Sequence, residues 1–335
     1  MNLGKLGQAL TAREIFELIQ HDLEQVEKKI TLESVASVDA VTAIGQYLHS
    51  SGGKRLRPSL LLLAAKLAGG DPASPMAIQL GAVVEMIHAA TLVHDDVIDT
   101  AQTRRGRPST NIKWGNHTCV LAGDWLYMQA FQIALRERVF QVLDLLIGLT
   151  QMMVEGELLQ LERIGRMDIS EADCMELVDR KTACLFSVCC RLGCLAGGGD
   201  LISQEKLGEY AWNLGMAFQL VDDVLDFTAR EKTLGKPVGG DLREGKITLP
   251  VVYALECASA EERRLVEVIL RERNYAAVPF ERILALLEKY HAIERVRERA
   301  QAFTDKARQV ISEFPDSPYQ RALLAVTELV TERDH

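Results

Sequence analysis

Two apolar helical runs in this sequence end in the same pattern of three aspartates, DDxxD. In Ala82–Pro108, apolar residues recur at the three- to four-residue spacing of one helical face, which predicts a buried helix. Phe218–Phe227 repeats the pattern. The aspartates are Asp95, Asp96 and Asp99 in the first run, and Asp222, Asp223 and Asp226 in the second. One such motif is usually only surface charge, but the repeat predicts two helices that face each other across a cavity.

The aspartate spacing predicts a metal site. Residues four apart on a helix project from the same face, so Asp95 and Asp99 are neighbours. Two carboxylates that close repel each other unless a cation lies between them. Hard oxygen ligands suit Mg²⁺, which typically takes one or two carboxylates plus substrate phosphates. Two such motifs across a cavity are therefore suited to hold several Mg²⁺ ions on one diphosphate.

Basic residues gather in local clusters of an otherwise acidic chain. The net charge of −9 argues against a general nucleic-acid surface. Arg104, Arg105 and Arg107 follow the first aspartates, and guanidinium groups beside a carboxylate-held metal suit a diphosphate. The loop Gly52–Pro58, GGKRLRP, lacks P-loop spacing but opens a helix with cations, which can bind phosphate. The clusters predict a small anionic substrate rather than a polyanion.

The remaining sequence predicts an all-α protein. Amphipathic helices are expected over 11–30, 139–161 and from 251 to the end, and no strand-type alternation appears. No run reaches the ~18 apolar residues of a membrane span. Seven cysteines without a secretory signal favour a reducing cytoplasm. Four of the cysteines lie close together on one expected helix: Cys184, Cys189, Cys190 and Cys194. Their spacings match no usual zinc site, so we predict that they are small apolar residues buried in the core.

Together these motifs resemble the trans-isoprenyl diphosphate synthase (polyprenyl synthetase) family. Six motifs follow the family's order: Gly52–Pro58, His94–Gly106, Glu155–Gln160, Lys181–Ala183, Phe218–Asp226 and Gly235–Pro250. The resemblance implies one helical bundle of the isoprenoid synthase type around a central cavity, spanning 1–335. Its core is 45–255, followed by C-terminal helices over 256–335. The N-terminal helix within 1–35 would pack at a homodimer interface or serve as a peripheral cover.

The resemblance also implies the reaction, a head-to-tail condensation of isopentenyl diphosphate with an allylic diphosphate. The six aspartates would be catalytic, and Asp95, Asp99 and Asp222 would hold Mg²⁺, three ions per site, with Mn²⁺ as an alternative. The implied ligands of isopentenyl diphosphate are Lys54, Arg57, His88 and Arg105. Those of the allylic diphosphate are Arg104, Lys181, Thr182, Gln219 and Lys236. Without the resemblance, His88 would be a core histidine and Lys181 a solvated lysine.

Two further elements would shape the site. Glu155–Gln160 interrupts an apolar helix face and lies beside the cavity in the family, although Gln160 is equally an ordinary surface residue. Gly235–Gly245 is a long glycine-rich loop with the composition of a mobile lid. Lys236 in this loop and Lys246 directly after it are expected to close over the allylic diphosphate and the metals.

Product length is predicted from the residues that precede Asp95. The family uses bulky aromatics four or five positions before this aspartate for short products, whereas this chain has Thr91 and Ala90, with Ile87 deeper. A helix rises about 1.5 Å per residue, so each turn of open cavity admits roughly one more C5 unit. The small side chains at positions 90 and 91 therefore predict a product of about C35–C45, for quinone side chains. The alternatives are a farnesyl or geranylgeranyl diphosphate synthase and the catalytic subunit of a heteromeric synthase. A terpene cyclase would lack the second DDxxD and GGKRLRP.

Overall fold

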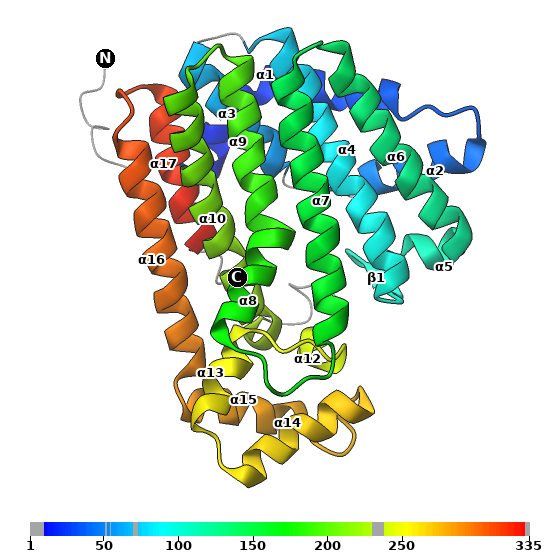
Figure 1. Ribbon diagram of the computed structural model, residues 1–335, viewed down its shortest axis with the longest axis vertical. Helices are drawn as coiled ribbons and strands as arrows, with labels where there is room; N and C mark the ends of the chain where they lie inside the picture. Colours follow the sequence, from blue (N-terminus) through cyan, green and yellow to red (C-terminus); the bar gives the residue numbers. More distant parts are fainter. Residues whose placement is uncertain (1–9, 51, 54, 70–72, 230–237, 332–335) are drawn as a thin grey trace.

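Helices form nearly all of this computed structural model, which describes residues 10–331 apart from 51, 54, 70–72 and 230–237 (Figure 1). The first half of the chain forms α1 (Ala12–Glu33), α2 (Asp39–Ser50), α3 (Leu56–Gly69), α4 (Pro75–Ile98), α5 (Thr110–Trp114), α6 (Asn116–Arg136) and α7 (Phe140–Arg163). There follow α8 (Glu171–Val178), the π-helical turn η1 (Asp179–Ala183), α9 (Cys184–Ala196), α10 (Leu201–Thr228) and α12 (Gly240–Arg243). The C-terminal part forms α13 (Leu249–Cys257), α14 (Ala260–Glu272), α15 (Phe280–Lys289), α16 (Ala292–Ser312) and α17 (Pro318–Thr331).

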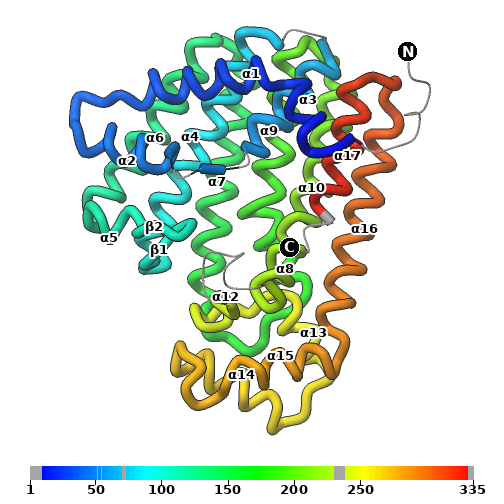
Figure 2. The backbone as a smooth tube through the Cα atoms, turned by 180° about the vertical axis from the view of Figure 1, so that it is seen from behind, coloured from blue at the N-terminus to red at the C-terminus, as the bar shows by residue number. Residues whose placement is uncertain are grey.

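The long helices pack around α10, which has α9 and α16 as its main neighbours. The α3 helix packs on α9, and α4 packs on α6 and α3. Figure 2 shows α1 crossing over one end of this bundle, while α14 and α15 lie at the other end. One continuous cluster of buried hydrophobic residues extends from Ile15 to Val330. The helices therefore share one hydrophobic core.

Local sequence signals account for several helix boundaries. Thr11 caps α1 through a capping box with Glu14, and Ser259 caps α14 in the same way with Glu262. Ser74 accepts a hydrogen bond at the start of α4, whose first residue is proline. The helices expected over 11–30 and 139–161 are observed as α1 and α7.

Two details of the fold differ from the sequence expectations. Thr103–Arg104 (β1) and Arg107–Pro108 (β2) pair as a two-residue antiparallel hairpin that carries the basic cluster. Glycine at position 106 has φ +73° and allows this tight turn, which is too short to produce an alternating pattern. Among the described residues, one helix, α4, has the length and hydropathy of a membrane span, but 56% of its most apolar window is buried against other helices.

The clustered cysteines are buried, as predicted. Cys189, Cys190 and Cys194 on α9 are free thiols without solvent exposure, and Cys184 is 6% exposed. Close approach of α9 to α3 depends on Gly193, because a methyl group there would lie 2.2 Å from the carbonyl oxygen of Leu61. The small residues of α9 therefore allow it to lie close to α3, the helix that carries Arg57 in its first turn.

Candidate active site

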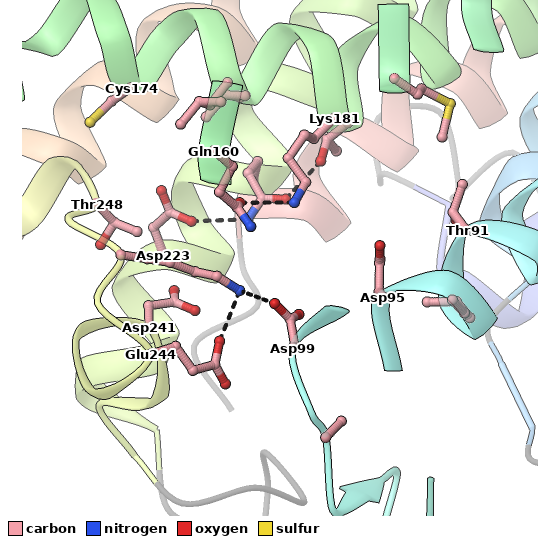
Figure 3. A pocket seen from close by; sticks show the side chains of 18 of the residues that line it. Thr91, Asp95, Asp99, Gln160, Cys174, Lys181, Asp223, Asp241, Glu244 and Thr248 are labelled. Carbon is pink, nitrogen blue, oxygen red and sulfur yellow. Dashed lines mark hydrogen bonds and ion pairs between the residues drawn. The ribbon is translucent and has the colours of Figure 1, made fainter. Parts of the chain in front are cut away.

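One cavity of about 540 Å³ brings together most of the predicted site residues. It lies among the C-terminal parts of α4, α7 and α10 and the turn η1 (Figure 3). The predicted residues on its wall are Arg57, His88, Thr91, Asp95, Asp99, Arg104, Arg105, Lys181, Thr182, Gln219 and Asp223. Lys54 and Lys236 lie outside the described residues.

The first aspartate motif divides into two faces. Asp95 and Asp99 line the cavity, whereas Asp96 is completely buried on another face of α4. The Asp96 carboxylate accepts hydrogen bonds from Arg104 Nε at 2.6 Å and from the backbone and hydroxyl of Thr110 at 2.9 and 2.8 Å. Asp96 therefore lies outside the cavity and holds Arg104 and Thr110 against α4, while its grouping with the catalytic carboxylates stays a prediction.

The three aspartates of the second motif also differ in position, and the one that lines the cavity is Asp223 rather than the expected metal ligand Asp222. Asp223 lines the cavity and accepts a hydrogen bond from Gln219 Nε2 at 2.9 Å. Asp226 is buried, and its Oδ2 accepts a hydrogen bond from the backbone N–H of Asp241 at 3.1 Å, which fixes the later part of the glycine-rich stretch Gly235–Gly245. Asp222 is half-buried and, among the described residues, is not one of those that line the cavity. Its role as a metal ligand stays a prediction.

Carboxylates crowd the cavity in a way that suits a divalent cation. Burial, with the nearby carboxylates of Glu157 and Asp99, raises the pKa of Asp95 to about 6, although Lys181 opposes the shift. Burial also raises the pKa of Asp223 well above its usual value, and the neighbouring Asp241 adds to this. Mg²⁺ binds oxygen donors, and it binds best where neighbouring positive charges do not already balance their negative charge. Within the described ranges, however, no three acidic, thiol or imidazole groups converge closely enough to hold a metal by themselves.

Two lysines on the wall are paired with carboxylates. Lys181 Nζ lies 2.6 Å from Glu157 Oε2 and donates to Gln160 Oε1 at 2.8 Å. Lys246 Nζ lies 2.9 Å from Asp99 Oδ1 and 2.8 Å from Glu244 Oε2, and so connects the segment around Gly245 to the first aspartate motif (Figure 3). Both lysines can exchange these partners for a bound anion.

Sequence reasoning assigned no individual role to several of these residues. Asp241 and Glu244 lie in the quoted motif Gly235–Pro250, which the sequence analysis identified without selecting these two residues, whereas it expected the lysines of the motif to act at the site. Glu157 likewise lies in the motif of α7. The fold is needed to show which side chains of each motif reach the cavity.

A separate group of basic side chains also lines the cavity. Arg57, His88 and Arg105 line it together. The Nε atom of Arg57 is buried and has no hydrogen-bond partner among the described residues. Burial, followed by the positive charges of Arg57 and Arg105, lowers the pKa of His88 well below its usual value. A buried guanidinium donor without a partner favours an anion here.

The basic loop contributes one structural residue as well. Arg55 donates to Glu85 on α4 at 2.9 Å and to Glu27 on α1 at 2.5 Å. These ion pairs tie the start of α3 to two other helices. Arg57, two residues on, is thereby held at the cavity wall.

Comparisons with known proteins agree with this geometry. The family model described as polyprenyl synthetase matches residues 38–287. The octaprenyl diphosphate synthase of Haemophilus influenzae is 34% identical over 331 residues, covering 99% of this chain and 100% of the relative. A short chain isoprenyl diphosphate synthase of Methanothermobacter thermautotrophicus is also 34% identical, over 96% of this chain and 99% of the relative. The crystal structure of a Caulobacter crescentus polyprenyl synthase complexed with calcium and isoprenyl diphosphate superposes with a TM-score of 0.92, at 34% identity, covering 98% of this chain and 99% of that one.

The chain therefore belongs to the polyprenyl synthetase family and is a prenyltransferase. The predicted family and the all-α isoprenoid synthase fold are confirmed.

The low pKa of His88 leads to a test. Because the folded protein keeps His88 neutral, it binds fewer protons than the unfolded chain just below pH 6.5, so this residue makes stability fall as the pH drops. We expect His88→Gln to flatten that fall, by up to about 1.4 kcal/mol per pH unit. Urea denaturation of both proteins at pH 7 and pH 5 measures this change in the free energy of unfolding. A His88 NMR resonance that titrates near pH 6.5 in the folded protein would contradict the assignment.

Proposed function

We propose that the protein condenses isopentenyl diphosphate head-to-tail with an allylic diphosphate, in an Mg²⁺-dependent reaction that yields a long all-trans polyprenyl diphosphate. The observation that carries this proposal is one cavity lined by two separate groups of basic side chains, Arg57, His88 and Arg105 in one group and Lys181 on η1 in the other. Arg57, His88 and Arg105 would bind isopentenyl diphosphate. Lys181, together with Thr182 on η1, would bind the allylic diphosphate beside the two aspartate motifs.

The residues would act mainly by positioning and by charge. Bound Mg²⁺, held by Asp95, Asp99 and Asp222, supplies positive charge that favours departure of the diphosphate. Lys181 and Arg104 add charge to the same leaving group. As the allylic carbon–oxygen bond breaks, the double bond of isopentenyl diphosphate forms the new carbon–carbon bond. The proton lost from the adduct passes to the released diphosphate, so no side chain has to act as a strong base.

Apolar residues below the aspartates would receive the growing chain. Thr91 and Leu92 of α4, Met153 of α7 and Leu185 of α9 line the cavity, and apolar walls exclude the water that would quench an allylic cation. Ala90 and Ile87 are fully buried behind this wall. The absence of an aromatic ring at positions 90 and 91 supports a product of about C35–C45, since each helical turn of depth admits roughly one C5 unit.

Overall similarity does not decide the product length. The octaprenyl and short chain relatives are equally similar to this chain, at 34% identity each. The argument for a long product therefore rests on the side chains at positions 90 and 91. We place the enzyme in the cytoplasm, where it would release its product to membrane-bound quinone synthesis.

Replacement of Thr91 tests the product length. Purified protein with Mg²⁺, farnesyl diphosphate and labelled isopentenyl diphosphate should yield products of about C35–C45, and Thr91→Phe should shorten them to roughly C15–C20 because the ring would block the cavity at position 91 and close off all the turns below it. Thr91→Val, a matched control of equal size, should keep the long product. Chain length is read by chromatography of the dephosphorylated products. A wild-type limit of C20 would contradict the proposed length, and activity only after a cell extract is added would indicate a heteromeric enzyme.

We also propose that the enzyme is a homodimer. Two neighbouring helices expose apolar side chains at seven-residue intervals, and such intervals keep side chains on one helical face. The exposed residues are Leu121, Met128 and Leu135 on α6, and Phe140, Ile147, Val154 and Leu161 on α7. If a second copy were related to the first by a two-fold axis, these two exposed apolar stripes on α6 and α7 would pack against the same two stripes of the partner. The expected role of the N-terminal helix in the interface stays a prediction.

Charge introduced into these stripes tests the homodimer. Met128→Lys combined with Ile147→Lys should convert a dimer to a monomer, because each change buries an unpaired ammonium group in the interface. The control is Leu201→Lys, at an equally exposed leucine on α10. Light scattering coupled to gel filtration measures the mass. A monomeric wild-type protein, or a dimer that survives both changes, would contradict the proposal.

A further inference from the structure

The turn η1 is a local irregularity that carries two of the proposed allylic-diphosphate ligands. It interrupts the helical path from α8 to α9 with a π-helical turn over Asp179–Ala183. Such turns are rare, and they often occur at functional sites because an extra residue redirects the side chains that follow. Lys181 and Thr182 both lie in this turn and line the cavity. The position of η1 therefore sets the position of both groups.

The motif of α7 lies along one side of this turn. Glu155 Oε2 is 2.7 Å from Arg180 Nη1, and Glu157 and Gln160 both contact Lys181 Nζ. Between these contacts, Gly156 is buried directly against the turn. A methyl group at position 156 would lie 2.7 Å from Arg180 Cβ and 3.3 Å from Lys181 Cγ. The backbones of α7 and η1 can approach this closely only because position 156 has no side chain.

The helix α10 contacts the turn from another side in a similar way. A methyl group at Gly215 would lie 2.7 Å from the Cα atom of Ala183. One turn earlier, Trp212 Nε1 donates to Asp179 Oδ1 at 2.6 Å. Thr182 Oγ1 donates to Gln219 Oε1 of the same helix at 2.8 Å. Each end of the turn is thus fixed against α10, while α7 fixes its middle.

We propose that Gly156 and Gly215 are positioning residues of the allylic diphosphate site, because they let α7 and α10 hold η1 where Lys181 and Thr182 reach the ligand. The identity of that ligand rests on the proposed function. Arg57, His88 and Arg105 belong to α3, α4 and the hairpin region rather than to η1. A shift of η1 should therefore weaken binding of the allylic substrate while leaving that of isopentenyl diphosphate unchanged.

Gly156→Ala tests the inference, with Gly148→Ala as its matched control. Gly148 lies on the same helix two turns earlier, and a methyl group there meets no atom within 4 Å. We expect Gly156→Ala to raise the KM for farnesyl diphosphate about ten- to a hundredfold, since displacement of a binding group by about an ångström has effects of this size. The KM for isopentenyl diphosphate should change less than about twofold, and Gly148→Ala should change neither. Calorimetric binding of farnesyl thiodiphosphate, an unreactive allylic analogue, should weaken in parallel.

The outcomes separate this inference from the proposed function. An equal rise of both KM values, or no rise for the allylic substrate, would overturn the inference while leaving the reaction intact. A wild-type protein without condensation activity would refute the proposed function, and the calorimetric comparison of the two alanine variants would still decide whether position 156 matters for allylic diphosphate binding. If Gly156→Ala does not fold, Trp212→Phe removes the donor to Asp179 and should raise only the allylic KM; unchanged kinetics in that variant would overturn the inference.

Discussion

Opposite charges held in one cavity are the constraint on which the rest of the structure depends. Asp95 and Asp223 are carboxylates whose burial raises their pKa, while Arg57 and His88 lie where burial lowers theirs. Because an unpaired buried charge costs several kcal/mol, groups of both signs gain from a ligand that carries the opposite sign. A diphosphate that arrives with divalent cations supplies both signs at once.

Much of the fold and of the site follows from the sequence. Apolar periodicity predicts α1 and α7, because helices that cover one core repeat their buried residues at helical spacing. The motifs are short and lie within single helices or loops, so the sequence carries their internal geometry directly. Asp95 and Asp99, four residues apart, do share the cavity wall. Small residues at helix contacts, such as the cysteines of α9, are also predicted from composition alone.

What the sequence does not predict depends on contacts between distant segments. Asp96 belongs to the same motif as Asp95 and Asp99, yet its carboxylate lies outside the cavity, where it accepts hydrogen bonds from Arg104 of the hairpin and from Thr110 at the start of α5. Lys246 reaches Asp99 across 147 positions of the chain. The π-helical turn leaves no periodic signal, since it shifts the helical phase by a single residue. The partners of Asp96 and Asp99 belong to other segments of the chain, which no local pattern identifies.

Binding of inorganic diphosphate, measured by calorimetry with and without Mg²⁺, tests the central claim most directly. The claim is that the carboxylates and cations of the cavity bind a diphosphate only when a divalent cation relieves the crowding at Asp95. The account predicts binding at least about tenfold tighter with Mg²⁺ than with a chelator, which is roughly 1.4 kcal/mol or more. It also predicts that Asp95→Asn removes most of this difference. Equal binding with and without Mg²⁺ would contradict the account.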